Sequence, residues 1–306
     1  MTGLFMKRLF CFGLGFTGLT LAKQLKASGW SVAGTRRTKD KAAILRSAGI
    51  DGFVFTGKEM APDVKKALAN ASHVLSTIAP DSSSAGNSAS GQIADPVLRY
   101  YKGDILNRAQ NLAWVGYLSS TNVYGDHDGQ WVDETTTPRP GSEHARQRLD
   151  IEHAWQDMVQ TDGVPVHILR PAGIYGPYRS ALTSLKNGTA KRVIRPGQWI
   201  SRIHVRDLAA VVIASAENQN PGSVYNVADD EPSPRETTIE FAAMLLNREP
   251  PPAIPFEQWQ TPPTAKRDFT TNKRIRNDRI KKDLGIVLTY PSYRDGLKAL
   301  FDAGEY

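Results

Sequence analysis

Short apolar runs alternate with amphipathic stretches along roughly the first 175 residues of the chain. A continuous apolar run of four to six residues is typical of a parallel strand covered on both faces, and the stretches between the runs have helical spacing. The predicted strands span residues 9–12, 30–35, 53–55, 73–78, 114–118 and 166–170. The alternation predicts an α/β fold with a doubly wound parallel sheet.

The first predicted strand leads directly into a glycine motif. Glycines stand at positions 13, 15 and 18, and residues 19–25 continue as a helix that Gly29 ends. Gly13 would allow a tight turn, Gly15 would let backbone amides approach a pyrophosphate, and Gly18 would let the helix pack on the strand. The helix N-terminus favours negative charge. This setting predicts dinucleotide binding, and a glycine-rich turn without a ligand is the alternative.

The composition is that of an ordinary globular protein. Of the 306 residues, 40% are hydrophobic and 23% are charged, and no apolar stretch is long enough to span a bilayer. The single cysteine, Cys11, lies in the first predicted strand and cannot form an internal disulfide. These features exclude a membrane-spanning chain and favour a reducing cytoplasm.

The net charge of +7 raises the question of nucleic-acid binding. Much of the excess lies in two basic tracts, residues 36–41 and residues 266–282. The second tract is interrupted by Asp268 and Asp278, as on a solvated helix face. Nucleic-acid binding is therefore the less favoured interpretation. Residues 81–91 are small and polar, and we expect a loop there.

Four segments resemble the extended short-chain dehydrogenase/reductases, the superfamily of nucleotide-sugar epimerases and dehydratases. They are GLGFTG at 13–18, LSSTNVYG at 118–125, LRPAGIYGP at 169–177 and RIHVRDLA at 202–209, in family order. The resemblance implies a Rossmann domain over residues 1–175 and 203–230, with 224–228 as a strand that returns to the sheet. It implies a smaller substrate-binding domain over residues 176–202 and 231–306.

The resemblance also implies hydride transfer on a hydroxyl or carbonyl of a polar small molecule, with a sugar nucleotide as one candidate substrate, and it allows a homodimer. The residues that family placement assigns to the cofactor are Gly13, Gly15, Phe16, Thr17, Gly18, Thr77, Ala79 and Pro80. The residues expected on the substrate side are Tyr175, Arg179, Arg195 and Arg202. These arginines could neutralise a diphosphate. The usual sugar-nucleotide arginine of the family stands slightly earlier than Arg202, which weakens the case for UDP-sugars.

The end of the second predicted strand distinguishes between two cofactors. An acidic residue there would hold the adenosine ribose 2′-hydroxyl of NAD, but the chain has Arg36 and Arg37. Guanidinium groups match a 2′-phosphate, so we expect NADP in preference to NAD. The alternative is an exposed basic turn.

The expected catalytic residues are only partly present. The family uses a Ser or Thr, a Tyr and a Lys around the nicotinamide, and Ser120 fits the hydroxyl residue. When the next helix is aligned with that of the family on Glu152, Arg148 stands where the family has its lysine, and His144 stands where it has its tyrosine. The two residues are one helical turn apart. Arginine can donate to ribose hydroxyls, and histidine titrates near neutrality.

Two classes of function therefore stay open. The first is an atypical NADP-dependent enzyme in which His144 transfers the proton. The second is an NADP-binding sensor or regulatory protein, in which the helix that carries His144 and Arg148 only frames the site. None of the six histidines has the spacing of a metal ligand set, and we expect no metal.

Overall fold

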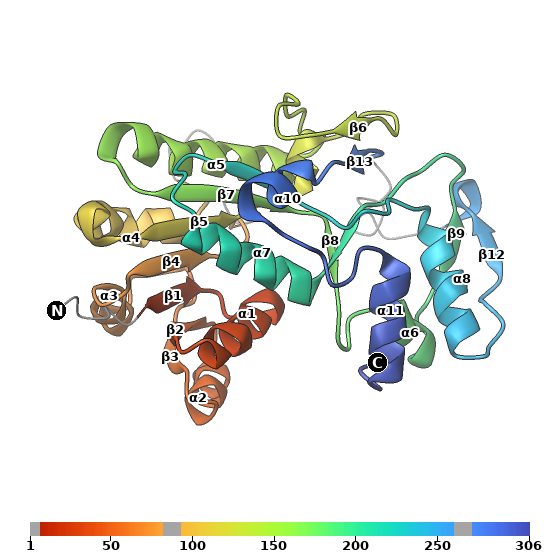
Figure 1. Ribbon diagram of the computed structural model, residues 1–306, viewed down its shortest axis with the longest axis horizontal. Coiled ribbons are helices and arrows are strands. Elements are labelled where there is room, and N and C mark those ends of the chain that lie inside the picture. Colours follow the sequence, from red (N-terminus) through yellow and green to blue (C-terminus); the bar gives the residue numbers. More distant parts are fainter. Residues whose placement is uncertain (1–6, 82–92, 260–270) are drawn as a thin grey trace. The chain divides into compact units, whose positions relative to one another are not determined.

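The computed structural model describes residues 7–81, 93–259 and 271–306 (Figure 1). The chain falls into two compact units. Unit 1 consists of Met1–Ser120, Ser142–Arg170 and Ala209–Tyr225, and unit 2 of Thr121–Gly141, Pro171–Leu208 and Asn226–Tyr306. Apart from Asp81, the predicted polar loop lies outside the described residues. No helix among the described residues is both long and apolar enough to cross a membrane.

Unit 1 is built on a seven-stranded sheet with the order β11-β7-β5-β4-β1-β2-β3. The strands are β1 (Arg8–Phe12), β2 (Ser31–Arg36), β3 (Asp51–Val54), β4 (His73–Ser76), β5 (Trp114–Leu118), β7 (Val166–Pro171) and β11 (Val224–Val227). Neighbours from β7 to β3 pair in parallel, and the winding reverses between β1 and β4. The predicted fold class is confirmed. Each predicted strand is present, with ends that differ by at most two residues.

Helices cover both faces of this sheet, as Figure 1 shows. The helices are α1 (Phe16–Ala27), α2 (Lys39–Ser47), α3 (Pro62–Leu68), α4 (Pro96–Leu106), α5 (Glu143–Asp162) and α7 (Val205–Glu217). Helices α3, α4 and α5 share one apolar core with Phe10, Phe12, Val115 and Tyr117 of the sheet. On the other face, the α7 residue Ser215 accepts a hydrogen bond from the Trp114 indole. Burial of both sheet faces explains the apolar runs in the sequence.

Helices α4 and α5 of unit 1 each begin at a side chain that caps them. Ser142 accepts a hydrogen bond from the Ala145 amide at the start of α5, and Gly163, with φ of 67°, ends that helix. Asp95 caps α4, and Pro96 follows in the first turn. These caps fix where α4 and α5 begin relative to the carboxyl ends of β4 and β5.

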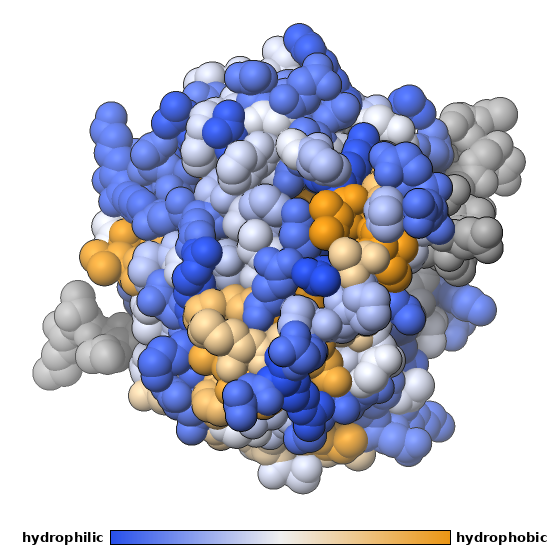
Figure 2. All heavy atoms as spheres, turned by 90° about the vertical axis from the view of Figure 1, so that its right-hand side faces the viewer, coloured by the Kyte–Doolittle hydropathy of each residue, from blue (hydrophilic) through white to orange (hydrophobic). Residues whose placement is uncertain are grey.

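Unit 2 consists of short elements. They are η4 (Thr121–Tyr124), β6 (Trp131–Val132), β8 (Gly173–Tyr175), α6 (Ala181–Lys186), β9 (Arg192–Ile194), β10 (Arg202–His204), α8 (Arg235–Leu245), β12 (Ala253–Pro255), η5 (Phe256–Gln258), β13 (Arg274–Ile275), α10 (Asp278–Leu284) and α11 (Tyr293–Asp302). The strands form three parallel pairs, β10-β8, β12-β9 and β13-β6. Residues of α6, α8 and α11 pack together in one apolar core. Figure 2 shows a mainly hydrophilic face with several hydrophobic patches.

The basic tract at 266–282 differs from the predicted helix face. Residues 266–270 lie outside the described residues, and the helical part is limited to α10. Lys273 is buried, and its Nζ donates to the Gly125 carbonyl over 3.0 Å. Burial lowers the pKa of Lys273 to about 8. The prediction of a solvated helix face was wrong for residues 271–277, because residues 274–275 form β13, which pairs with β6, and Lys273 just before it is buried.

Candidate cofactor site

The glycine turn after β1 is held between the ends of two neighbouring strands. Gly13 has φ of +91°, and its amide donates to Thr35 Oγ1 of β2 over 2.9 Å. The Gly13 carbonyl accepts a hydrogen bond of 2.6 Å from Thr77 Oγ1, just beyond β4. The Leu14 amide donates to the Thr35 carbonyl. The turn therefore has a fixed shape before any ligand binds.

The three glycines of the motif meet different surroundings. A Cβ atom at Gly13 would lie 2.7 Å from Thr77 Oγ1, and one at Gly18 would lie 3.1 Å from the Gly13 carbonyl oxygen. At Gly15 the nearest such atom is the Gly13 carbonyl oxygen, 3.9 Å away. Close packing therefore favours glycine at 13 and 18, whereas a Cβ atom at Gly15 would make only an ordinary van der Waals contact. This is the arrangement needed for a phosphate to approach the backbone.

Gly15 is also the N-cap of α1. Gly15 has no side chain that could cap this helix, and no acidic residue lies in its first turn, which holds Phe16, Thr17 and Gly18. The helix dipole favours an anion at this N-terminus, and no carboxylate in the first turn opposes one. The residues present fit the pyrophosphate of a dinucleotide.

Two arginines stand at the end of β2. The Arg36 guanidinium donates a hydrogen bond to the Leu14 carbonyl, so its side chain lies across the glycine turn. Arg37 is exposed. Of the other residues assigned to the cofactor, Thr77 is half-buried, Ala79 is exposed and Pro80 is buried. A positive charge therefore lies beside the glycine turn.

The residues predicted for chemistry lie at the carboxyl end of β5 and at the start of α5. Ser120 is half-buried and follows β5 by two residues, and the Arg148 guanidinium donates to the Leu118 carbonyl over 3.3 Å. His144 is half-buried in the first turn of α5. Arg148 thus reaches the strand end that carries Ser120.

Glu152, the residue on which the helix was aligned with that of the family, is fully buried. It accepts hydrogen bonds from the Arg170 guanidinium of β7, the shortest of them 2.6 Å long. The pair ties α5 to the sheet one turn beyond Arg148. The face of α5 that carries Arg148 and Glu152 is therefore turned toward the sheet.

Sequence reasoning missed two buried polar groups near Arg148. They are Asp95, the cap of α4, and Tyr117 of β5, whose ring stacks on Trp155 at 6.1 Å. Burial raises the pKa of each group, and the positive charge of Arg148 lowers it. The Asp-Pro pair at 95–96 is a readable signal for a helix start. No sequence signal pairs Asp95 with α5.

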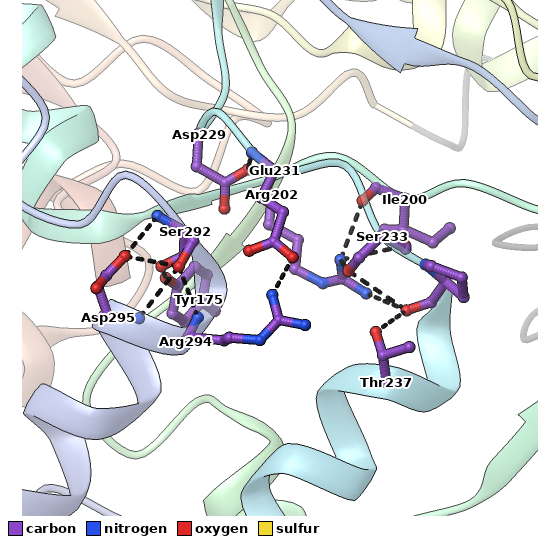
Figure 3. A network of polar contacts seen from close by, with 11 residues as sticks. Tyr175, Ile200, Arg202, Asp229, Glu231, Ser233, Thr237, Ser292, Arg294 and Asp295 are labelled. Atoms are coloured by element: carbon purple, nitrogen blue, oxygen red, sulfur yellow. Dashed lines mark hydrogen bonds and ion pairs between the residues drawn. The ribbon is translucent and has the colours of Figure 1, made fainter.

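The residues predicted for substrate belong to unit 2, and two of them share a buried polar network (Figure 3). Arg202 is 9% exposed, and its guanidinium donates to Ser233 Oγ over 2.8 Å and to the Ile200 carbonyl over 3.0 Å. Burial lowers the pKa of Arg202 to about 10. The buried Tyr175 hydroxyl donates to the Ser292 carbonyl over 3.4 Å. The Arg202 guanidinium and the Tyr175 hydroxyl thus both donate hydrogen bonds to other residues of unit 2.

Asp229 belongs to the same network and was not predicted from the sequence. It is 1% exposed, and in Figure 3 its carboxylate points toward the middle of the network. Burial raises its pKa to about 8, although the charge of Arg202 lowers it. The other two predicted residues lie elsewhere: Arg179 is exposed, and the Arg195 guanidinium lies 4.9 Å from the centre of the Phe256 ring. Over residues 7–81, 93–259 and 271–306, no cluster of three or more His, Cys, Asp or Glu side chains could hold a metal.

Comparison with known proteins gives the context of this site. Residues 13–228 match the model of the NAD dependent epimerase/dehydratase family. A solved structure of a functionally unknown conserved protein from Silicibacter pomeroyi is 42% identical, with a TM-score of 0.85 over 98% of this chain and all of that one. Protein YeeZ of Escherichia coli K12 is 28% identical over 94% of this chain and 97% of its own length. A 3-diazoavenalumate denitrifying reductase from Streptomyces is 28% identical over 62% of each chain.

Proposed function

The chain belongs to the NAD dependent epimerase/dehydratase family, as its four segments predicted, and from that premise we propose that it is an NADP-dependent oxidoreductase acting on a hydroxyl or carbonyl of a polar small molecule. The observation that carries the proposal is the turn at Gly15. It combines a backbone position with no close neighbour, a helix N-terminus without an acidic residue in its first turn, and the charge of Arg36. These three features suit a dinucleotide phosphate.

Each part of the cofactor would have its own group of residues. The amides at Gly15 and the start of α1 would hold the pyrophosphate, and Arg36 and Arg37 would hold the 2′-phosphate. Thr77, Ala79 and Pro80 would line the cofactor, and Arg148 would donate to the ribose next to the nicotinamide. The bound cofactor would supply or accept a hydride at its nicotinamide ring.

The chain itself would supply the proton. In our proposal Ser120 orients the substrate oxygen, and His144 donates a proton to a carbonyl oxygen or removes one from a hydroxyl. Arg148 stays a fixed cation, because a guanidinium does not lose its proton in proteins. The usual tyrosine and lysine would thus be replaced by His144 and Arg148.

The proposed substrate is a class, polar small molecules, and not one compound. A sugar nucleotide remains one candidate from the family, and the relative named as a reductase supports a reductive reaction. The Arg202 guanidinium donates to groups of unit 2 itself. Arg179, Arg195 and Arg202 stay the candidates for contact with a diphosphate.

One observation favours a second candidate, a cofactor-binding regulatory protein without turnover. The Arg148 guanidinium donates to the backbone at Leu118, and in the alignment on Glu152 the chain has His144 and Arg148 where the family has its tyrosine and lysine. Such a protein would bind NADP at the same turn. It would not oxidise NADPH with any carbonyl substrate.

The test is NADPH oxidation with a panel of carbonyl compounds that includes a 4-keto sugar nucleotide. We expect His144→Asn to lower turnover by roughly 10²–10⁴-fold and to leave NADPH affinity unchanged, as for loss of a general acid. His153→Asn, at an exposed position of the same helix, is the matched control. Tight NADPH binding without oxidation would favour the regulatory protein, and an active His144→Asn variant would refute the role of His144.

A further inference from the structure

A tight turn follows β8, and its second central residue has an unusual backbone conformation. Pro177 and Tyr178 are the two central residues. The flanking residues, Gly176 and Arg179, exchange two backbone hydrogen bonds of 3.0 and 3.1 Å. Tyr178 has φ of 57°. Proline followed by a residue with positive φ is the pattern of a type II turn, which favours glycine or asparagine at the second position.

Tyrosine is an unexpected residue in this conformation. Among the residues that the structure describes, the non-glycine positions with positive φ are Asp128, Tyr178 and Asn247. Aspartate and asparagine enter this region more readily than other residues, because their short polar side chains can hydrogen-bond to the local backbone. A tyrosine side chain cannot do so, and its Cβ atom crowds the following carbonyl oxygen. The backbone at Tyr178 is therefore strained.

The surrounding backbone holds Tyr178 in this conformation. In addition to the two hydrogen bonds that close the turn, the Tyr178 amide donates to the Glu305 carbonyl over 3.0 Å. Glycine at position 178 could make the same backbone hydrogen bond without the strain. The backbone of the turn thus gives no reason for a large side chain at this position.

Packing gives little reason for the Tyr178 ring either. Tyr178 is 68% exposed, whereas Tyr175, three residues earlier, is 9% exposed and belongs to an apolar core of unit 2. A single exposed aromatic residue is ordinary on a protein surface, but here the residue also costs backbone strain. Strained residues of this kind cluster at sites that bind ligands. The reason for the Tyr178 side chain therefore lies in what it contacts outside the fold.

The next residue indicates the chemistry of that contact. Arg179 is exposed, so the turn presents an aromatic ring beside a guanidinium group. An aromatic ring stacks on another ring, and a guanidinium group binds phosphate. A protein partner would need a contact area of about 800 Å² on each side, far more than one side chain offers. The pair therefore suits a small molecule that has a ring joined to a phosphate.

We propose that Tyr178 is a specificity-determining residue whose ring packs on a ring of the substrate, while Arg179 binds the phosphate joined to that ring. The ring is a nucleotide base or a sugar, and the experiment below distinguishes the two. The proposal rests on the proposed function, which already takes Arg179 as a candidate contact of the substrate. Tyr178 selects ring-bearing substrates, and its strained backbone keeps the ring exposed.

The experiment measures the binding of uridine monophosphate, glucose 1-phosphate and inorganic phosphate by calorimetry. The protein is saturated with NADPH, so that the probes do not enter the cofactor site. We expect at least one ring-bearing probe to bind more tightly than phosphate, and Tyr178→Gly to weaken its binding about tenfold, the effect of losing one stacking contact. Phosphate binding should change less than about twofold. Tyr178→Phe, which keeps the ring, should bind like the wild type.

Two outcomes would overturn the proposal: no ring-bearing probe binds more tightly than phosphate, or Tyr178→Gly binds that probe unchanged. The tighter of the two ring-bearing probes identifies the ring as a base or a sugar. NADPH binding to the wild type is measured first and tests the proposed function separately. If NADPH does not bind, the proposed function fails, and the probes are titrated into the ligand-free protein.

Urea unfolding tests whether the Tyr178 ring serves the fold instead. Tyr178→Ala and Tyr178→Gly both remove the ring, but only glycine relieves the backbone, so Tyr178→Gly should unfold at the higher urea concentration. It should also be at least as stable as the wild type. Asn247→Gly, at another exposed position with positive φ, should bind the probes unchanged. Equal midpoints for the alanine and glycine variants, or a Tyr178→Gly variant less stable than the wild type, would contradict the proposal.

Discussion

Gly13, Gly15 and Gly18 illustrate how one motif serves packing and binding at once. Gly13 needs its positive φ and the small gap to Thr77, and Gly18 needs the close approach of α1 to the turn. Neither requirement involves a ligand. At Gly15 an added Cβ would have only one contact, of 3.9 Å, so packing does not explain this glycine, and we propose that it leaves room for a cofactor phosphate.

This difference predicts the behaviour of Gly15→Val. The added side chain would clash with little of the protein, so the variant should fold, but it would fill the space that a pyrophosphate needs. We expect no measurable NADPH binding by calorimetry and a circular dichroism spectrum like that of the wild type. Gly103→Val, at an exposed and open position of α4, should keep its binding. A folded Gly15→Val variant that still binds NADPH would show that the nucleotide lies elsewhere.

The raised pKa of Asp229 predicts how stability depends on pH. The carboxyl keeps its proton up to about pH 8 in the folded chain, whereas its ordinary pKa is 3.8. The unfolded state therefore loses a proton first, and Asp229 destabilises the fold as the pH rises from about 4 to about 8. The slope for one proton is at most about 1.4 kcal/mol per pH unit.

Urea unfolding of the wild type and of Asp229→Asn at several pH values measures this effect. The variant should lack the decrease in unfolding free energy between pH 4 and pH 8 that Asp229 causes. Asp230→Asn, an exposed neighbour that pairs with Lys281, should keep it. If the unfolding free energies of the wild type and of Asp229→Asn changed with pH in parallel, the raised pKa of Asp229 would be contradicted.

The cofactor residues were proposed from a local sequence motif, whereas the buried polar groups Asp95, Tyr117 and Asp229 were not predicted. The glycine motif is local, so six residues carry the whole signal. Asp95, Tyr117 and Asp229 gain their properties from burial and from partners that are distant along the chain. The roles of His144 and Arg202 stay predictions.

Among the elements, the strands of unit 1 were predicted most closely. Their apolar runs follow from burial on both faces, and that pattern is visible in the sequence itself. The short strands of unit 2 have no comparable pattern, and β13 was expected to be part of a helix. Two-residue pairings such as β13-β6 depend on contacts with the rest of unit 2, which a charge pattern does not encode.

One buried ion pair, Glu152–Arg170, adds to the apolar packing that attaches helix α5 to the sheet. Glu152→Gln would leave the buried Arg170 guanidinium without its countercharge. We expect a loss of about 3–5 kcal/mol in the free energy of unfolding. Glu143→Gln, on the same helix, breaks only the exposed pair with Arg146 and should cost less than about 0.5 kcal/mol. Equal losses in urea unfolding would show that the buried pair does not anchor α5.

At the scale of the whole molecule, the chain combines a doubly wound sheet unit with a second unit of short elements. The predicted domains, 1–175 with 203–230 and 176–202 with 231–306, stay a prediction, as do the cytoplasmic location and the homodimer. The candidate cofactor residues belong to unit 1, and the candidate substrate residues belong to unit 2. In unit 1, the glycine turn and Arg36 should therefore select NADP.

Titration of the protein with NADPH and with NADH, followed by cofactor fluorescence, tests that claim most directly. We predict tighter binding of NADPH, and a loss of about 1.5–3 kcal/mol of that binding in Arg36→Ala, because a charge-assisted contact to the 2′-phosphate is removed. NADH binding should not change in this variant. Lys39→Ala, which removes an exposed cation at the start of α2, should bind both cofactors as the wild type does. Equal affinities for the two cofactors, or an Arg36→Ala variant that binds NADPH unchanged, would contradict the account.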